Sequence, residues 1–167
     1  CPVCDDGMEA HVCPIHEVPT VAQSAFQHVP APIEVGDLVD GAFHVSAILG
    51  EGSMGTVFAV TDSEGRRWAL KAIKVRDDSS RQLTKRFYRE ALVVSKLRHP
   101  GVVQIERFAV DERSGLPYLT MEFVEGRTLY DYLAGADASL AKVIDLTCQL
   151  LDALAHAHGQ GIVHRDL

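Results

Sequence analysis

Closely spaced glycines in the first third of the chain have the pattern of a phosphate-binding loop. The G-x-G-x-x-G pattern consists of Gly50, Glu51, Gly52, Ser53, Met54 and Gly55. Glycines let backbone N–H groups approach phosphate oxygens that a Cβ would keep away. In a dinucleotide-binding fold this loop would open a helix. Here the β-branched and apolar residues 56–61 follow it, so we expect a loop between two strands.

A lysine and a glutamate each lie where a lone charge is costly. In a strand over 66–75, Lys71 shares a face with Ala69, and in a helix over 82–97, Glu90 lies within the apolar stripe. An unpaired charge on either face loses hydration without compensation. We therefore expect Lys71 and Glu90 to pair. The alternative is that both side chains extend to solvent.

Three of the four cysteines fall within the first 13 residues, and their spacing is typical of a zinc site. Cys1-x-x-Cys4 and Cys13-x-x-His16 form two ligand pairs of matched spacing, which suits a tetrahedral Zn²⁺. A disulfide or reduced surface thiols are the alternatives, although three clustered cysteines cannot all pair with one another. His11 competes for the fourth position, but the matched spacing favours His16.

Composition predicts a soluble globular protein of about one domain. The chain has 167 residues, of which 47% are hydrophobic and 23% charged, with a net charge of −7. The acidic excess lies in residues 1–42, which contain no Lys or Arg. No stretch is basic enough for nucleic acid, and no apolar run of about 18 residues could span a membrane. The sequence contains no signal-peptide pattern, so we expect a cytoplasmic protein. The residues at both termini predict that the sequence is a piece of a longer chain.

Periodicity predicts an α+β fold, not alternating βαβ units. The expected strands cover 43–51, 56–61, 66–75, 102–110 and 117–123, and the expected helices cover 82–97 and 139–158. The proline-containing residues 17–42 predict a linker with little core of its own. The second helix has a continuous apolar stripe, and Cys148 beside it is expected to be a core thiol.

Residues 43–167 resemble the first half of a protein kinase domain. The match runs in order through the glycine-rich loop with Val57, Ala69-Leu70-Lys71, Arg89-Glu90-Ala91 and His164-Arg165-Asp166-Leu167. Residues 35–41 and 121–126 are similar to bacterial serine/threonine kinases, some of which also carry a cysteine-rich module before the kinase domain.

The resemblance implies a layout for the whole chain. A zinc-binding module (1–16) and a linker (17–42) would precede the small lobe and hinge (43–124), and residues 125–167 would form the start of the large lobe, truncated at the catalytic loop. The small lobe would be a five-stranded antiparallel sheet with one regulatory helix, followed by the first helices of a mostly helical large lobe.

The resemblance also implies roles in ATP binding. Val57 and Ala69 would enclose the adenine ring, Glu122 and Val124 would bond its edge through backbone groups, and Met121 would gate the pocket behind it. Lys71, held by Glu90, would contact the α- and β-phosphates. Thr128 stands where some kinases place an acid near the ribose.

The implied activity is transfer of the ATP γ-phosphoryl group to a serine or threonine of a protein substrate. Asp166 would accept the proton of the substrate hydroxyl. The Mg²⁺ ligands of the family would follow Leu167, so we expect the chain alone to be inactive. The alternative is a pseudokinase, an ATP-binding scaffold whose cysteine-rich module binds partner proteins. Tyrosine specificity depends on residues after Asp166 and stays open.

Overall fold

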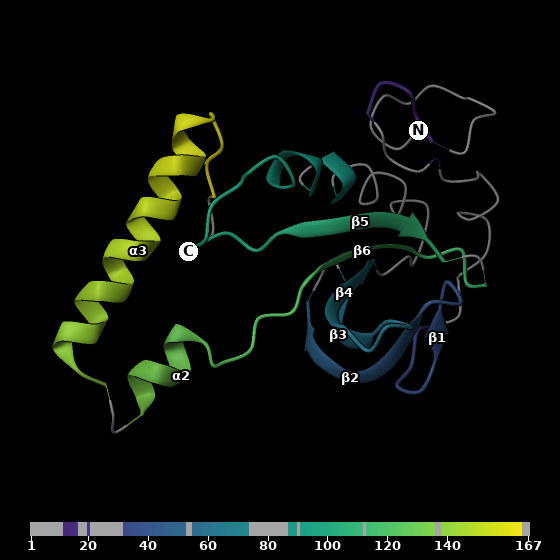
Figure 1. The fold of residues 1–167 in the computed structure, drawn as a ribbon, viewed down its shortest axis with the longest axis horizontal. Helices are drawn as coiled ribbons and strands as arrows, with labels where there is room; N and C mark the ends of the chain where they lie inside the picture. The colour runs from purple at the N-terminus through teal and green to yellow at the C-terminus, as the bar shows by residue number, and fades with distance from the viewer. Residues whose placement is uncertain are drawn as a thin grey trace.

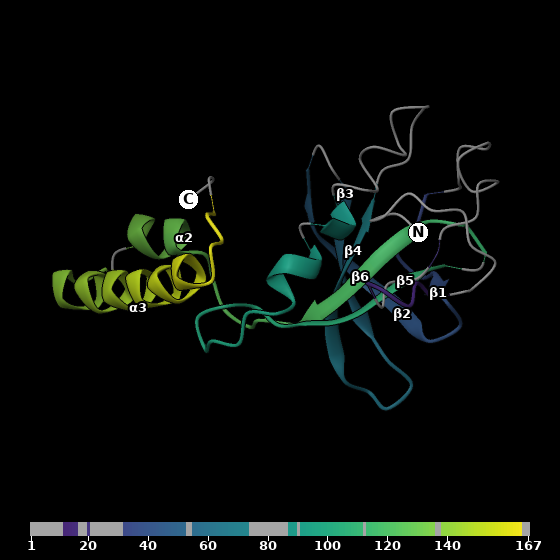
Figure 2. The ribbon, with the colours of Figure 1, turned by 90° about the horizontal axis from the view of Figure 1, so that it is seen from above.

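Within its described residues, the computed structural model contains a six-stranded antiparallel sheet, a helical segment over residues 87–94 that packs on it, and two further helices (Figures 1 and 2). The structure describes residues 12–16, 20, 32–52, 55–73, 87–89, 91–111, 113–135 and 138–164. In chain order the elements are β1 (Leu38–Val39), β2 (Phe43–Glu51), β3 (Gly55–Thr61), β4 (Arg67–Ile73), β5 (Ile105–Val110), β6 (Pro117–Glu122), α2 (Leu129–Ala134) and α3 (Leu140–Gly159).

The sheet has the order β1-β2-β3-β4-β6-β5. The α+β prediction and the five predicted strands are confirmed, with ends that differ by up to three residues. Strand β5 begins at Ile105 instead of residue 102, because the preceding residues form a turn in which the Val102 N–H donates to the His99 carbonyl (3.0 Å). Strand β1 was not predicted, because its two residues are too few to show periodicity.

The last part of the predicted linker is packed against the sheet. Ile33 and Val39 are buried in the same apolar cluster as Phe43 and Tyr118. The Asp40 carboxylate accepts hydrogen bonds from the Tyr118 hydroxyl (2.8 Å) and from Arg107 (2.7 Å). The packed part of the sheet therefore begins before Phe43, within residues that the sequence assigned to a tether.

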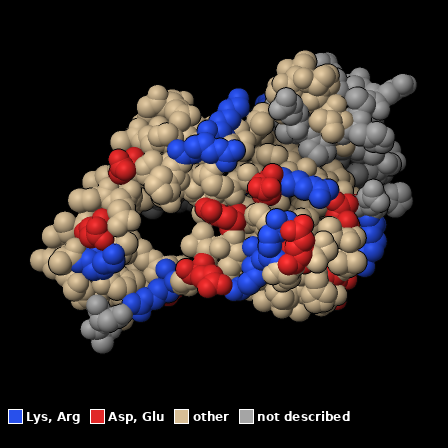
Figure 3. Space-filling model, viewed as in Figure 1, with Lys and Arg blue, Asp and Glu red and all other residues tan. Residues whose placement is uncertain are grey.

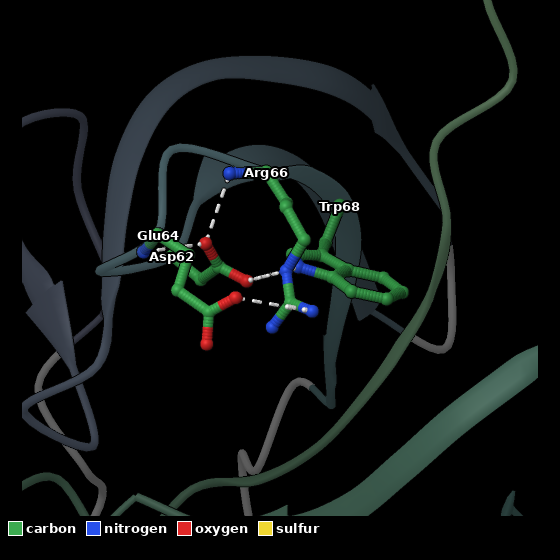
Figure 4. Close-up of polar contacts among 4 residues, drawn as sticks. All are labelled: Asp62, Glu64, Arg66 and Trp68. Carbon is green, nitrogen blue, oxygen red and sulfur yellow. Dashed lines mark hydrogen bonds and ion pairs between the residues drawn. The ribbon is translucent and has the colours of Figure 1, made fainter.

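One aspartate organises the turn between β3 and β4 (Figure 4). Oδ1 of Asp62 accepts the backbone N–H groups of Glu64 and Arg66, both at 2.9 Å. Oδ2 accepts the Arg66 Nε–H (2.8 Å) and the Trp68 Nε1–H (2.9 Å). The Trp68 hydrogen bond, followed by those from Arg66, lowers the pKa of Asp62 well below its usual range. The ionised carboxylate thus fixes the hairpin that precedes β4.

The sheet has an apolar cluster on each face. Side chains of β2, β3 and β4 on one face, including Val45, Phe58 and Leu70, form the cluster that contains Val39. On the other face, Ile73 of β4 and Leu119 of β6 pack with Phe87, Tyr88 and Ala91. These three residues come from a helical segment, 87–94, in which residue 90 is not described. The described part of the helix predicted over 82–97 therefore has the expected buried face, but the helix ends at Val94 and not at residue 97.

The segment after this helix contacts α3. His99 Nε2 lies 3.1 Å from an Asp152 carboxylate oxygen, and its ring lies against that of His156, with centroids 5.2 Å apart. The predicted helix 139–158 is confirmed as α3, and the Ser139 hydroxyl caps it by accepting the Lys142 N–H (3.3 Å).

Most of α3 is exposed. Only Ala153 and Ala157 of α3 are buried. Cys148 is exposed, so the expectation of a core thiol is wrong for this chain: it lies away from the two alanines that contact the rest of the molecule. Within the described part of the chain, no helix is both long and apolar enough to cross a membrane.

Candidate nucleotide-binding site

Strand register brings the predicted ATP-binding residues to one face of the sheet. Val57 lies opposite both Gly50 of β2 and Lys71 of β4. Ala69 lies opposite Met121 of β6. Directly opposed residues of antiparallel strands project to the same face, and residues two apart on one strand do so as well. The four side chains of Val57, Lys71, Ala69 and Met121 therefore share the face that packs against the helical segment 87–94.

A cleft of about 530 Å³ opens beside this face. Its lining consists of Leu49, Arg67, Ala69, Val103, Met121, Glu122, Phe123, Val124, Glu125 and Gly126. Pockets of several hundred Å³ with mostly apolar walls are typical of small-molecule sites. The space-filling view shows the molecule hollowed between the sheet and the helices (Figure 3). In the same view, positive and negative side chains are mixed.

The cleft contains Ala69, Met121, Glu122 and Val124 from the sequence-predicted site, and six residues that were not predicted to belong to the site. Among these, Arg67 forms an ion pair with Glu125 (2.6 Å), and its guanidinium carbon lies 3.9 Å from the Phe123 ring centroid. Strand alternation from Ala69 could have placed Arg67 on the same face. Its contact with the segment after β6 had no local signal, because the two partners are 58 residues apart.

The last residue of β6, Glu122, uses its backbone N–H and its carboxylate within the protein. The Glu122 N–H already donates to the Gln104 carbonyl (3.0 Å), and the Glu122 carboxylate accepts the Gln104 N–H (3.1 Å). The Glu122 N–H is therefore engaged within the protein. The Val124 side chain is 65% exposed at the edge of the cleft.

Lys71 is half-buried and directed towards the helix. Its Nζ lies 5.9 Å from the centroid of the Phe87 ring, and Phe87 is one of the buried residues of the segment 87–94. Glu90, its predicted partner, is outside the described residues, so the ion pair stays a prediction. Ser53, Met54, Arg165 and Asp166 are outside them as well.

The glycines of the loop have two different surroundings. A Cβ on Gly55 would lie 2.1 Å from the Ala72 carbonyl oxygen, which is a severe overlap with the neighbouring strand. A Cβ on Gly50 would have nothing within 4 Å, and one on Gly52 would only meet the Gly55 carbonyl oxygen at 3.8 Å. Gly55 is thus required by the β3–β4 pairing, whereas Gly50 and Gly52 leave open space beside the loop.

Two of the four predicted zinc ligands are described. The Cys13 Sγ and His16 Nδ1 atoms are 3.6 Å apart. With ordinary Zn–S and Zn–N bonds, two ligands of one tetrahedral zinc lie about 3.6 Å apart, which is also a normal sulfur–nitrogen hydrogen-bond distance. Cys1, Cys4 and the competing His11 are outside the described residues. Within the described ranges, no group of three or more His, Cys, Asp or Glu side chains could hold a metal ion.

The sheet, the helix packed on one face of it, and the cleft at its edge define the small lobe of a protein kinase. The family model for the protein kinase domain matches residues 43–167, and the chain belongs to this family. Among curated relatives, it is 39% identical to serine/threonine-protein kinase pkn2 of Myxococcus xanthus over 131 residues, and 32% identical to serine/threonine-protein kinase PrkC of Bacillus subtilis over 135.

These alignments cover 78% and 80% of this chain but only 16% and 20% of the two relatives. Among solved structures, the kinase domain of PknI from Mycobacterium tuberculosis matches with a TM-score of 0.62 and 26% identity, over 81% of this chain and 55% of that one. The protein-kinase-like fold expected from the sequence is therefore confirmed.

Proposed function

We propose that this chain is the ATP-binding half of a serine/threonine protein kinase. The observation that carries the proposal is the single sheet face that presents Val57, Lys71, Ala69 and Met121, next to a cleft of suitable size. Both relatives named above are serine/threonine-protein kinases. We further propose the division into a cysteine-rich module, a linker, a small lobe and the start of a large lobe, with the linker ending before residue 32.

In this proposal the adenine ring lies against Ala69 and Val57, and Met121 limits the depth of the pocket. The Val124 backbone bonds the edge of the base, together with the Glu122 carbonyl, since the Glu122 N–H is engaged with Gln104. The open space at Gly50 and Gly52 accommodates phosphate oxygens. Lys71, oriented by Glu90, neutralises charge on the α- and β-phosphates.

In the transfer step, the hydroxyl oxygen of the protein substrate forms a bond to the γ-phosphorus. The bond from this phosphorus to the β–γ bridging oxygen breaks, and the hydroxyl proton passes to Asp166. Mg²⁺ would neutralise charge on the phosphates when bound, and we expect its ligands in the protein beyond the residues of this chain.

The test uses the full-length protein and transfer of radiolabelled phosphate from ATP to a protein substrate. Lys71→Met and Asp166→Asn should each reduce transfer by at least about a hundredfold, since they remove the phosphate contact and the proton acceptor. Lys142→Met is the matched control, because Lys142 is an exposed residue of α3 that pairs only with its neighbour Asp145 in the described structure. Undiminished transfer in Lys71→Met and Asp166→Asn would contradict the proposal.

A pseudokinase is the second candidate, and the same preparation separates it from a kinase. A scaffold would bind ATP through the cleft, and Lys71→Met would weaken that binding, yet the wild-type protein would transfer no phosphate. Phosphate transfer by the wild-type protein excludes the scaffold.

We also propose that Cys1, Cys4, Cys13 and His16 bind one structural Zn²⁺. Support comes from the matched spacing and from the Cys13–His16 separation. Elemental analysis of the full-length protein should find about one zinc per chain, which Cys4→Ser removes. His16→Ala should reduce zinc content, whereas His11→Ala should not; the reverse result would assign the fourth position to His11. A metal-free wild-type protein would reject the site.

A further inference from the structure

A turn near the N-terminus is part of the apolar cluster on the helix side of the sheet. Cys13 has an exposed fraction of 0%. The buried residues of its cluster are Ile73, Phe87, Tyr88, Ala91 and Leu119. In Figure 1 the turn, drawn in purple, lies above β5, on the same side as the helical segment 87–94. A residue expected only to bind metal is thus also a packing residue of the kinase domain.

The cluster joins three elements that are otherwise separate in the sequence. Ile73 ends β4, Leu119 lies in β6, and the aromatic pair Phe87 and Tyr88 belongs to the helical segment. Cys13 therefore packs where the helix meets the sheet. Interiors of this kind are close-packed, so removing atoms from one member is felt by its neighbours.

Next to this cluster, Tyr88 of the helical segment makes a hydrogen bond and a ring contact with β5. The Tyr88 hydroxyl donates to the Ala109 carbonyl of β5 (3.1 Å), and the Tyr88 ring lies 6.0 Å from that of Phe108. The neighbouring residue of the same segment, Phe87, lies next to the Lys71 ammonium. Cys13 thus belongs to the same buried cluster as Phe87, whose ring lies next to the Lys71 ammonium.

We propose that residues 12–16 are an intramolecular docking element that holds the helical segment 87–94 against the sheet and thereby sets the position of Lys71. Its partner surface is the cluster of Ile73, Phe87, Tyr88, Ala91 and Leu119 within the same chain. The docking itself does not depend on zinc. Its consequence for ATP rests on the function proposed above, because it acts through the lysine assigned to the phosphates.

The first experiment measures backbone hydrogen exchange of residues 87–97 in the full-length protein. Cys13→Ala removes the buried sulfur and should speed this exchange by about fivefold, as expected for a modest loss of local stability. Cys148→Ala is the matched control, since it makes the same change at an exposed position on α3, and it should leave the exchange unchanged. Equal exchange in the two variants would overturn the docking element.

The second experiment needs no variant and therefore survives a folding failure of Cys13→Ala. Alkylation of Cys13 in the native protein, located by peptide mass spectrometry, should be at least about tenfold slower than in the urea-unfolded protein, because a buried thiol reacts only after local opening. The protection should persist after a chelator has removed any metal. Protection that disappears with the chelator would mean that metal alone shields the thiol, and would overturn the docking.

The third measurement separates this inference from the proposed function. In Cys13→Ala the KM for ATP should rise while the protein remains able to transfer phosphate, and Cys148→Ala should keep the wild-type KM. If the wild-type protein transfers no phosphate but the exchange and alkylation results hold, the docking stands and the kinase assignment fails. If transfer is normal and KM and exchange are both unaffected in Cys13→Ala, the docking fails and the kinase assignment stands.

Discussion

At the scale of single residues, the glycines of the glycine-rich loop meet two different requirements, one from the fold and one from a ligand. The spacing of the glycines does not show which glycine meets which requirement. Gly55 faces the carbonyl of Ala72 across the β3–β4 ladder, where even a methyl group overlaps backbone atoms. Gly50 lies in open space and has no such conflict. One glycine is therefore needed by the fold, and the other is free to serve a ligand.

This difference predicts opposite effects of the same substitution. Gly55→Ala should lower the free energy of unfolding by about 2 kcal/mol, since backbone must move to relieve the overlap. Gly50→Ala should leave stability nearly unchanged but weaken ATP binding, because its Cβ enters the space proposed for phosphate. Thermal unfolding and binding of a fluorescent ATP analogue measure the two properties. Equal destabilisation by both variants would contradict the assignment.

At the scale of secondary-structure elements, a polar clamp joins the β1–β2 turn to the β5–β6 hairpin. The buried carboxylate of Asp111 accepts the Asp40 N–H (2.7 Å) and the Ser114 N–H (2.8 Å). Burial by itself would raise the pKa of Asp111, but hydrogen bonds from Ser114 and Asp40 and the nearby Arg113 charge lower it overall. The clamp thus depends on an ionised aspartate.

The sign of this pKa shift predicts acid sensitivity. A lowered folded-state pKa means that Asp111 contributes stability above its unfolded pKa of about 3.9, and that the contribution is lost as pH falls through the folded-state pKa. Asp111→Asn should therefore destabilise the full-length protein by about 2 kcal/mol at neutral pH, and by less near pH 3. Glu64→Gln, at an exposed position in the β3–β4 turn, should change stability little at either pH. A pH-independent loss in Asp111→Asn, measured by denaturant unfolding, would argue against the ionised clamp.

At the scale of the whole molecule, α3 presents an apolar stripe to solvent in this chain. Leu140, Ile144 and Leu151 are 77%, 55% and 58% exposed, respectively. Contiguous apolar surface promotes association. We therefore expect the 167-residue chain to self-associate in a concentration-dependent manner.

Charges on the stripe should reverse this association. The double variant Ile144→Glu, Leu151→Glu should weaken self-association at least about tenfold in Kd, because two apolar side chains no longer gain from burial. Gln149→Glu adds a charge to the same helix without removing apolar surface and should have little effect. Sedimentation velocity over a range of concentrations measures both. A monodisperse wild-type chain would show that the stripe does not drive association.

The sequence by itself determined the features that depend on local chemistry. Strand alternation and helical periodicity predicted the positions of β2 to β6 and α3, because side-chain burial repeats with the period of the backbone. The order of the glycine-rich loop, Lys71 and the later motifs identified the family, and the resemblance predicted four of the ten residues that line the cleft. The shared face of Lys71 and Ala69 followed from alternation, and the strand register adds Val57 to that face.

Only the tertiary structure decided which distant segments meet. Three features join residues that are far apart in the chain. They are the burial of Cys13 in the cluster of the helical segment, the Arg67–Glu125 ion pair and the packing of β1. Nothing in the neighbouring sequence encodes such a pairing, since it results from the way both elements fill one close-packed interior. Cys148 is a second case in which the local sequence did not determine the burial of a residue. Its helix was correctly predicted, but its exposure depends on which side of α3 the rest of the chain covers, and the covered side is that of Ala153 and Ala157.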